Sequence, residues 1–284
     1  MRQYRRRIGA CGACCLTVLI LAGARTSGAQ STSEPTWRDV DGGPLPFQSE
    51  ADVLEFLRSG HVVSERTIGT GINESRKILL EKDGVRAHAI FRDVDVGKET
   101  AKIAGTTYRF FADSYRFEPA AFELARTLGL ESIPPAVNRR VGRREGSAQI
   151  WVEDTVDEES GEFRPPSAIA WAEQVQDMDL FDNLVYNIDR NAGNLLVGSG
   201  YRLWMIDHTR AFQLKDTLLN DRIRRVRRRT WERLVALDEE ALTAQLSSYL
   251  TPLQLRSLWR RRERIIEYVN DLVHQLGEDA IFFE

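Results

Sequence analysis

LFDNLVYNIDRNAGNLLV, at residues 180–197, and WMIDH, at residues 204–208, are the two stretches that decide how this chain folds. An apolar helical run ends in a polar loop, and two short apolar strands follow, predicted at Asn194–Val197 and Leu203–Ile206. Asp189 lies in the loop, and Asp207 follows the second strand. The pattern therefore predicts that oxygen-bearing side chains gather at the edges of a tight hairpin.

Three residues of these stretches suit phosphoryl transfer. That reaction needs a group that orients the attacking hydroxyl, and oxygen ligands that hold Mg²⁺ against a triphosphate. Asp189 suits the first role, while Asn194 and Asp207 suit the second, because hard cations take carboxylate and amide oxygens. A competing interpretation is an ordinary turn, in which Asp189 caps Asn191 and Arg190 is exposed to solvent. For the loop alone, both interpretations stay open.

Outward from these stretches, the chain divides into a strand-rich first half and a helical second half. The expected strands are His61–Ile68, Lys77–Leu80 and Val85–Arg92, which form an antiparallel meander, and a later strand at Ala148–Glu153. The expected helices are one from Ser49 to Gly60, Glu118–Leu128, Ala168–Tyr186, and one that begins at Thr251 with Pro252 at its first position. We expect an α+β fold with a small sheet-rich lobe at about residues 49–153, a larger helical lobe at about residues 163–284, and a ligand cleft between them.

The loop motif DRNAGN, residues 189–194, with IDH, residues 206–208, resembles the catalytic and metal-binding loops of the phosphatidylinositol 3-/4-kinase superfamily and its bacterial relatives. Similar patterns occur in HipA-type kinases and in secretory-pathway kinases of the Golgi casein kinase type. The likeness spans about Val62–Phe212 and includes Glu118–Leu130 and Ile133–Pro135. It implies a bilobal protein-kinase-like fold that uses ATP and Mg²⁺, or Mn²⁺ in its place.

The resemblance also implies roles for single residues. Asp189 would be the catalytic base, Asn194 and Asp207 the metal ligands, and Glu118 the helix carboxylate that pairs with a nucleotide-contacting cation. Gly69, Thr70 and Gly71 would form the phosphate-covering turn, although glycines in a hairpin are usually only turn residues.

One position departs from the family. Where the third strand usually offers a lysine, this chain has Arg92, which is not interchangeable with lysine, and Lys77 on the preceding strand is a possible substitute. The leading hypothesis is an ATP- and Mg²⁺-dependent kinase that acts on a hydroxyl of a protein, lipid or sugar. The alternatives are a nucleotide-binding pseudokinase or scaffold, and AMP transfer from the same site.

The N-terminus has the layout of an export signal. Four arginines precede an apolar run from Cys14 to Ala24, which is too short to span a bilayer, and small residues follow. We expect a signal peptide at residues 1–29 and a linker at residues 30–48, so the protein would be periplasmic or secreted, with no transmembrane span after cleavage. All three cysteines lie in this segment, so the mature protein would lack thiols.

Net charge and histidine spacing argue against nucleic-acid binding and against a histidine metal site. Removal of residues 1–29 changes the formal net charge from −3 to −8, which disfavours nucleic-acid binding. Within this acidic chain, Arg222–Arg229 is strongly basic and is either a solvated helix face or a docking surface for an acidic ligand. The four histidines lack metal-ligand spacing, and only His208, beside Asp207, adjoins the predicted site.

Overall fold

The computed structural model describes residues 37–68, 75–103, 105–157, 165 and 167–284. The chain from Pro35 to Glu284 forms one compact unit. The predicted signal peptide and the predicted phosphate turn at residues 69–71 lie outside the described residues, so both stay predictions. The division into lobes near residues 153 and 163 also stays a prediction.

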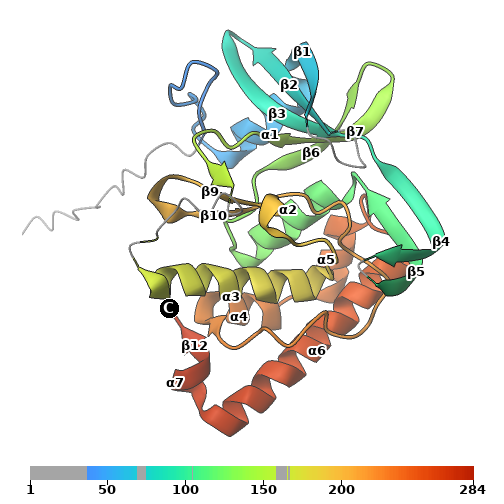
Figure 1. Cartoon of the computed structure of the whole chain (residues 1–284), viewed down its shortest axis with the longest axis vertical. Coiled ribbons are helices and arrows are strands. Elements are labelled where there is room, and N and C mark those ends of the chain that lie inside the picture. Colours follow the sequence, from blue (N-terminus) through green and yellow to red (C-terminus); the bar gives the residue numbers. More distant parts are fainter. Residues whose placement is uncertain (1–36, 69–74, 104, 158–164, 166) are drawn as a thin grey trace, which may run out of the picture. The chain divides into compact units, whose positions relative to one another are not determined.

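A five-stranded antiparallel sheet dominates the first half (Figure 1). Its strands are β1 (His61–Ile68), β2 (Ser75–Lys82), β3 (Val85–Arg92), β6 (Ala136–Val141) and β7 (Arg144–Ile150), in the order β1-β2-β3-β7-β6. The predicted meander β1-β2-β3 is confirmed. The predicted strand at Ala148–Glu153 belongs to β7, which begins four residues earlier and ends at Ile150.

The strand register decides which side chains share a face. Lys77, Ile90 and Gln149 lie in one row across β2, β3 and β7. Arg92 pairs with Ser147 two residues further along, so it projects from the same face as that row. The opposite face carries apolar residues such as Ile78 and is covered by helix α1 (Glu50–Ser59).

Helices α1 and α2 (Phe117–Leu128) begin and end at the predicted residues, within one position. A capping box between Ser49 and Asp52 starts α1. Gly60 ends it, and a Cβ there would lie 2.7 Å from the Phe56 carbonyl oxygen, so only glycine fits. Gly129 ends α2 in the left-handed conformation, with φ of 71°.

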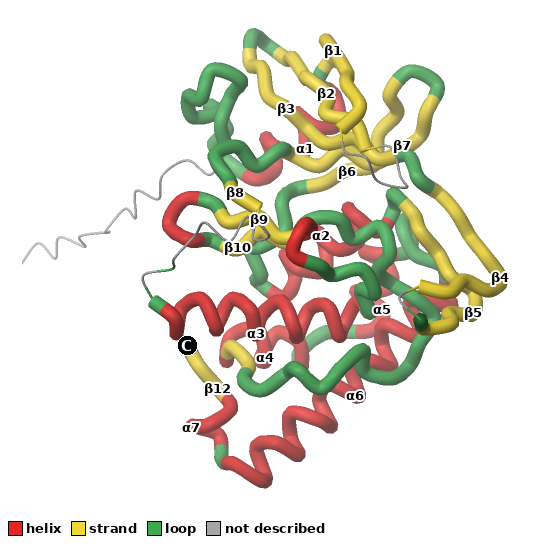
Figure 2. Tube along the Cα trace, in the orientation of Figure 1, coloured by secondary structure: helices red, strands yellow, loops and turns green. Residues whose placement is uncertain are grey.

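A second hairpin, absent from the sequence prediction, follows β3. Strands β4 (Asp95–Ile103) and β5 (Thr106–Ser114) pair with each other as a separate two-stranded sheet at the side of the molecule (Figure 2). Most side chains of β4 are exposed, so its sequence lacks the apolar alternation by which half-buried strands are recognised.

The second half is helical, as predicted. Its helices are α3 (Ala168–Val185), α4 (Arg228–Val235), α5 (Glu239–Leu246), α6 (Pro252–Leu276) and α7 (Glu278–Ile281). Short strands accompany them: β8 (Val156–Asp157), β9 (Leu195–Val197), β10 (Leu203–Met205), β11 (Val226–Arg227) and β12 (Phe282–Phe283). Thr251 caps α6 in a capping box with Gln254, which confirms the predicted start. The sheet-rich and helical parts together confirm the predicted α+β class.

No described helix combines the length and the apolarity that crossing a membrane requires.

Candidate functional site

The sheet meets the helical half at a buried ion pair between Arg92 and Glu118. Arg92 ends β3, Glu118 lies in the first turn of α2, and Arg92 Nη1 is 3.5 Å from Glu118 Oε1. The two side chains are 6% and 0% exposed. Burial alone would raise the pKa of Glu118, but the Arg92 charge and hydrogen bonds from His208 lower it to about 2. Glu118 is therefore a carboxylate at neutral pH.

His208 lies on the other side of Glu118. Its backbone N–H donates to Glu118 Oε1 at 2.8 Å, and its ring is fully buried. Arg190 Nη2 lies 2.9 Å from His208 Nε2, and because a guanidinium only donates, Nε2 accepts. The ring proton then sits on Nδ1, 3.7 Å from Glu118 Oε2. Through its backbone N–H and its ring Nε2, His208 thus links α2 to the loop after α3.

Arg190 organises that loop. Its Nε and Nη2 donate to the two carboxylate oxygens of Asp182 on α3, at 2.8 and 3.1 Å. Its Nη1 donates to the carbonyl oxygens of Asn194 and Ile206, at 2.9 and 2.8 Å. The side chain is only 9% exposed. The turn interpretation with a solvent-exposed Arg190 is therefore wrong, because this guanidinium joins both loops to the helix.

Through Arg190, the structure brings Asp189, Asn194 and Asp207 together. Asn194 Nδ2 donates to the Asp189 carbonyl oxygen at 2.8 Å, and the Ile206 N–H donates to the Asn194 carbonyl oxygen at 3.1 Å. Asn194 ends a short 3₁₀ helix, one residue before β9, instead of beginning the strand. Asp207 follows in a left-handed conformation with φ of 57°. The two polar edges of the hairpin thus share one backbone network.

The Asp189 carboxylate is half-buried and faces several charges. Burial raises the pKa of Asp189, against the charges of Arg210 and Arg190, and nearby Asp207 and Asp113 raise it further. Arg210 Nη1 donates to Asp189 Oδ2 at 3.0 Å. Arg210 and Asp113 lie outside the predicted site residues, since they are 97 positions apart and neither belongs to a loop motif.

Lys77 does not pair with Glu118 in the described structure, and its predicted contact with the nucleotide stays a prediction. Its Nζ lies 3.6 Å from Glu153 Oε1 and 3.9 Å from the centre of the Trp151 ring. His88 Nδ1 lies 2.7 Å from the same Glu153 oxygen. Burial lowers the pKa of Lys77, and the Glu153 carboxylate opposes this. Of the two candidate cations, Arg92 is the one that pairs with Glu118.

The Arg92 side chain also has unused hydrogen-bonding capacity beside the candidate metal ligand Asp207. Its side chain makes no hydrogen bond to the described residues. The guanidinium nitrogens lie 3.5 Å from Glu118 Oε1 and 3.8 Å from Asp207 Oδ2, and the buried Nε and Nη1 have no acceptor there. A buried charged donor without an acceptor costs at least about 1–3 kcal/mol. An anionic ligand beside Arg92 and Asp207 would supply the missing acceptors.

Asp207 and Asn194 also offer oxygen ligands for a hard cation that binds the same anion. Asp207 offers a carboxylate that is about one-third exposed, and Asn194 offers a side-chain oxygen that accepts no hydrogen bond within the described chain. The described residues contain no group of three or more His, Cys, Asp or Glu side chains arranged for a metal ion. A divalent cation here would therefore need oxygens from its ligand as well, which is usual for Mg²⁺.

The middle of the basic stretch Arg222–Arg229 binds the chain's own C-terminal segment, through Arg225, Arg227 and Arg228. Arg227 Nε and Nη2 each lie 3.0 Å from Asp177 Oδ2, and Arg227 Nη1 donates to the Glu284 carbonyl oxygen at 2.6 Å. Arg228 lies 3.5 Å from Glu278. The interpretation as a solvated helix face is wrong for β11. An external acidic ligand would meet the exposed residues, namely Arg222, Arg224 and Arg229.

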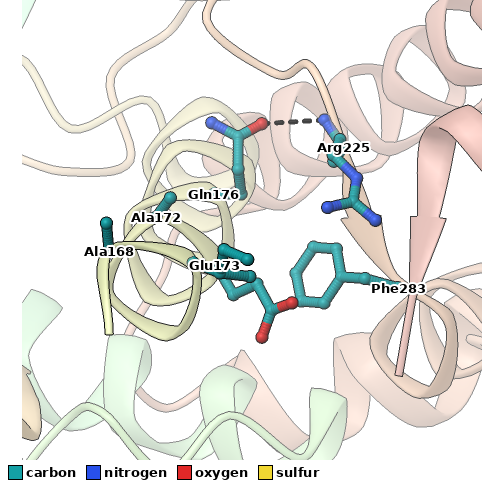
Figure 3. Close-up of a pocket in the computed structure, with 7 residues that line it drawn as sticks. Ala168, Ala172, Glu173, Gln176, Arg225 and Phe283 are labelled. Carbon is teal, nitrogen blue, oxygen red and sulfur yellow. Dashed lines mark hydrogen bonds between the residues drawn. The ribbon is translucent and has the colours of Figure 1, made fainter. Parts of the chain in front are cut away.

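A pocket of about 240 Å³ lies beside this junction, away from Asp189 (Figure 3). Figure 3 shows Gln176 on α3 accepting a hydrogen bond from the Arg225 backbone, with Phe283 between Arg225 and Glu173. The lining offers one carboxylate, Glu173, and the guanidinium of Arg225, which donates to the Phe282 carbonyl oxygen. The groups suited to chemistry converge around Asp189 instead.

The chain resembles solved kinase structures. A structure of hydra Fam20 with sugar matches with a TM-score of 0.63 and 17% identity, over 84% of this chain and 94% of that one. The Golgi casein kinase matches with a TM-score of 0.60 and 16% identity, over 81% and 78%. The same kinase with Mn/ADP bound gives 0.61 and 15%, over 82% and 78%.

The fold is kinase-like. At 15–17% identity these structures establish the kinase-like fold alone. No protein-family model matches the chain, and no curated protein matches it by sequence. The likeness includes the Golgi casein kinase type, one of the families that the loop motifs resemble. Membership in the phosphatidylinositol 3-/4-kinase superfamily is not shown by these structures.

Proposed function

We propose that the protein is an ATP- and Mg²⁺-dependent kinase that transfers the γ-phosphate to a hydroxyl of a protein, lipid or sugar. The observation that supports it most is the buried Arg92, which pairs with Glu118, makes no hydrogen bond within the described chain, and lies 3.8 Å from Asp207. A nucleotide phosphate at this position would accept from Arg92 and meet the candidate metal ligands.

Each residue then has a stated task. Arg92 binds the phosphates, and Glu118 holds Arg92 in place. Asp189 accepts the proton of the acceptor hydroxyl. At the same time the hydroxyl oxygen bonds to the γ-phosphorus, and the bond between that phosphorus and the ADP oxygen breaks. Asn194 and Asp207 would hold the metal, which when bound neutralises phosphate charge; Mn²⁺ is an alternative, since the Golgi casein kinase structure holds Mn/ADP.

The test is phosphate transfer from ATP by the purified protein to a panel of protein, lipid and sugar hydroxyls. We expect transfer to at least one acceptor, and Asp189→Ala should reduce it by at least about 100-fold. Asp271→Ala, which removes an exposed carboxylate on α6, is the matched control and should leave transfer unchanged. Transfer that survives Asp189→Ala would remove Asp189 from the role of base.

A second candidate is a nucleotide-binding pseudokinase, favoured by arginine at the position where related kinases carry lysine. Arginine spreads its charge over a planar fork and is not equivalent to the lysine ammonium. Calorimetry that shows ATP binding without turnover on any acceptor would favour this candidate. Transfer of AMP, with release of pyrophosphate, would identify the third alternative.

We also propose export through the signal peptide predicted at residues 1–29, which would place this chemistry in the periplasm or outside the cell. Expression in a bacterial host, followed by N-terminal sequencing of protein from the extracytoplasmic fraction, tests it. A mature chain that begins near Gln30 is the expected result, and protein that stays in the cytoplasm with an intact N-terminus contradicts it.

A further inference from the structure

Arg210 connects the candidate base to the β4–β5 hairpin. Its Nε donates to Asp113 Oδ2 on β5 at 2.9 Å, and its Nη1 donates to Asp189 Oδ2 at 3.0 Å. The Asp113 side chain is 5% exposed and that of Arg210 is 18% exposed. One guanidinium is thus shared by a buried carboxylate and by the carboxylate proposed as base. Charge-assisted hydrogen bonds of this length are among the strongest side-chain contacts in a protein.

The base of the hairpin is fixed to the segment that carries Arg210. The Ser114 N–H donates to the Thr209 carbonyl oxygen at 2.8 Å. Gln213 accepts from the Ala112 N–H at 3.1 Å and donates to the Ala112 carbonyl oxygen at 2.6 Å. These bonds lie on either side of Asp113 in β5, so hydrogen bonds to the β5 backbone as well as charge set the position of Asp113 relative to Arg210.

The other contacts of Asp189 constrain its backbone and leave its carboxylate to Arg210. The Asp189 N–H donates to Asn187 Oδ1 at 3.3 Å, and its carbonyl oxygen accepts from Asn191 and Asn194. Oδ2 accepts from Arg210, whereas Oδ1 accepts no hydrogen bond within the described chain. The contact with Arg210 therefore decides which carboxylate oxygen is left to meet an acceptor hydroxyl.

We propose that Arg210 and Asp113 are positioning residues that orient Asp189, so that the β4–β5 hairpin forms part of the active site. Asp113 holds Arg210, Arg210 holds Oδ2, and Oδ1 receives the acceptor proton. The role of Asp189 as base rests on the proposed function, but the mechanical link from hairpin to loop does not.

The first test compares three variants of the purified protein in the transfer assay. Asp113→Asn and Arg210→Lys should lower kcat by about 10- to 100-fold while the KM for ATP stays unchanged, because misplacement of a catalytic group costs rate. Arg210→Lys should retain more activity than Arg210→Met, since lysine keeps the charge but cannot contact both carboxylates as the planar fork does.

The control is a second ion pair, between Asp95 at the start of β4 and Arg116 at the N-cap of α2. Arg116 Nη1 lies 2.9 Å from Asp95 Oδ2, and both side chains are more than 40% exposed. Arg116→Gln should leave kcat and KM unchanged, because this pair has no contact with Asp189. An equal loss of kcat in Arg116→Gln and Asp113→Asn would mean that the hairpin contributes stability alone and would overturn the proposal.

A second measurement separates this inference from the proposed function. In Asp113→Asn, the backbone amide NMR signals of residues 187–191 should shift, whereas in Arg116→Gln they should not. If the wild type transfers no phosphate but these amide signals move in Asp113→Asn, the kinase proposal fails and the positioning link stands. If the chemical shifts of residues 187–191 are the same in Asp113→Asn as in the wild type, the link is absent, whatever the activity.

Discussion

The surroundings of Arg92 and those of Arg227 are both built from arginine and carboxylate, yet they differ in one respect. Arg227 uses all three guanidinium nitrogens on the chain itself, in bonds to Asp177 and Glu284. Arg92 is more deeply buried, and it makes no hydrogen bond within the described residues. The first arrangement is complete without a ligand, and the second leaves buried donors without acceptors.

A high density of positive charge is therefore a poor indicator of an anion site in this chain. The stretch Arg222–Arg229 is dense in positive charge, yet it contacts the chain's own strand β12 and helix α7. Arg92, on a strand with few other charges, lies beside Asp207 and has two buried nitrogens left for a ligand. Helix α3 contributes a carboxylate to each region: Asp182 binds Arg190 near the candidate site, and Asp177 binds Arg227. Substitutions of these two arginines therefore compare the two regions.

The largest effect is expected from Arg190→Met. It would leave the buried Asp182 carboxylate without its bidentate partner and remove the donor shared by Asn194 and Ile206. Breaking a buried pair on one side costs about 3–5 kcal/mol, so the free energy of unfolding in urea should fall by that amount. The matched variant Arg227→Met, whose side chain is 28% exposed, should cost about 1 kcal/mol. Equal losses would erase the distinction between the two regions.

A smaller effect, about 2 kcal/mol, is expected for ATP binding in Arg92→Met. The substitution removes the charged donors that the phosphates would use, which corresponds to an affinity about 30-fold weaker. Titration calorimetry with ATP and Mg²⁺ measures it. Arg227→Met should bind ATP like the wild type, because its donors are already used. Unchanged affinity in Arg92→Met would place the nucleotide elsewhere.

The smallest effect concerns pH and Asp177. Burial raises the pKa of Asp177 to about 6, despite the opposing charge of Arg227. The folded form therefore holds the proton more tightly than the unfolded form, whose pKa is near 3.8, so this group's contribution to stability is complete below pH 4 and is lost as pH rises through 6. Asp177→Asn should flatten the decline in unfolding free energy between pH 4 and 6 by on the order of 1 kcal/mol.

Asp179 on the same helix titrates in the same range, since burial also raises its pKa to about 6. Some decline should therefore persist in Asp177→Asn, and Asp179→Asn is the variant that isolates the remainder. Urea unfolding at a series of pH values distinguishes the two contributions. A decline as steep in Asp177→Asn as in the wild type would show that the Arg227 junction does not titrate there.

Several boundaries could be predicted because they depend on neighbouring residues alone. Ser49 with Asp52 and Thr251 with Gln254 form capping boxes three residues apart, so the starts of α1 and α6 follow from a local pattern. The strands β9 and β10 lie within the loop motif and were placed within one residue of each end. The β4–β5 hairpin was missed because its exposed strands carry no apolar alternation.

The candidate site also has a part that could be predicted from neighbouring residues and a part that could not. Asp189, Asn194 and Asp207 lie within 19 residues of one another, and a short hairpin suffices to bring them together. The choice of Arg92 over Lys77 as the partner of Glu118 depends on how β3 faces α2, which no local pattern specifies. The burial of Arg190 likewise depends on Asp182, Asn194 and Ile206 meeting at one guanidinium.

The amino-acid sequence alone therefore determined the helix caps, the strand-loop-strand unit around Asp189, and the order of a sheet-rich part before a helical part. Short-range sterics and hydrogen bonding govern those features. The charges that pair across distant elements, such as Asp113 with Arg210 and Arg92 with Glu118, follow instead from the three-dimensional packing. Those pairings follow from packing that removes water from both partners at once, and this depends on the whole chain.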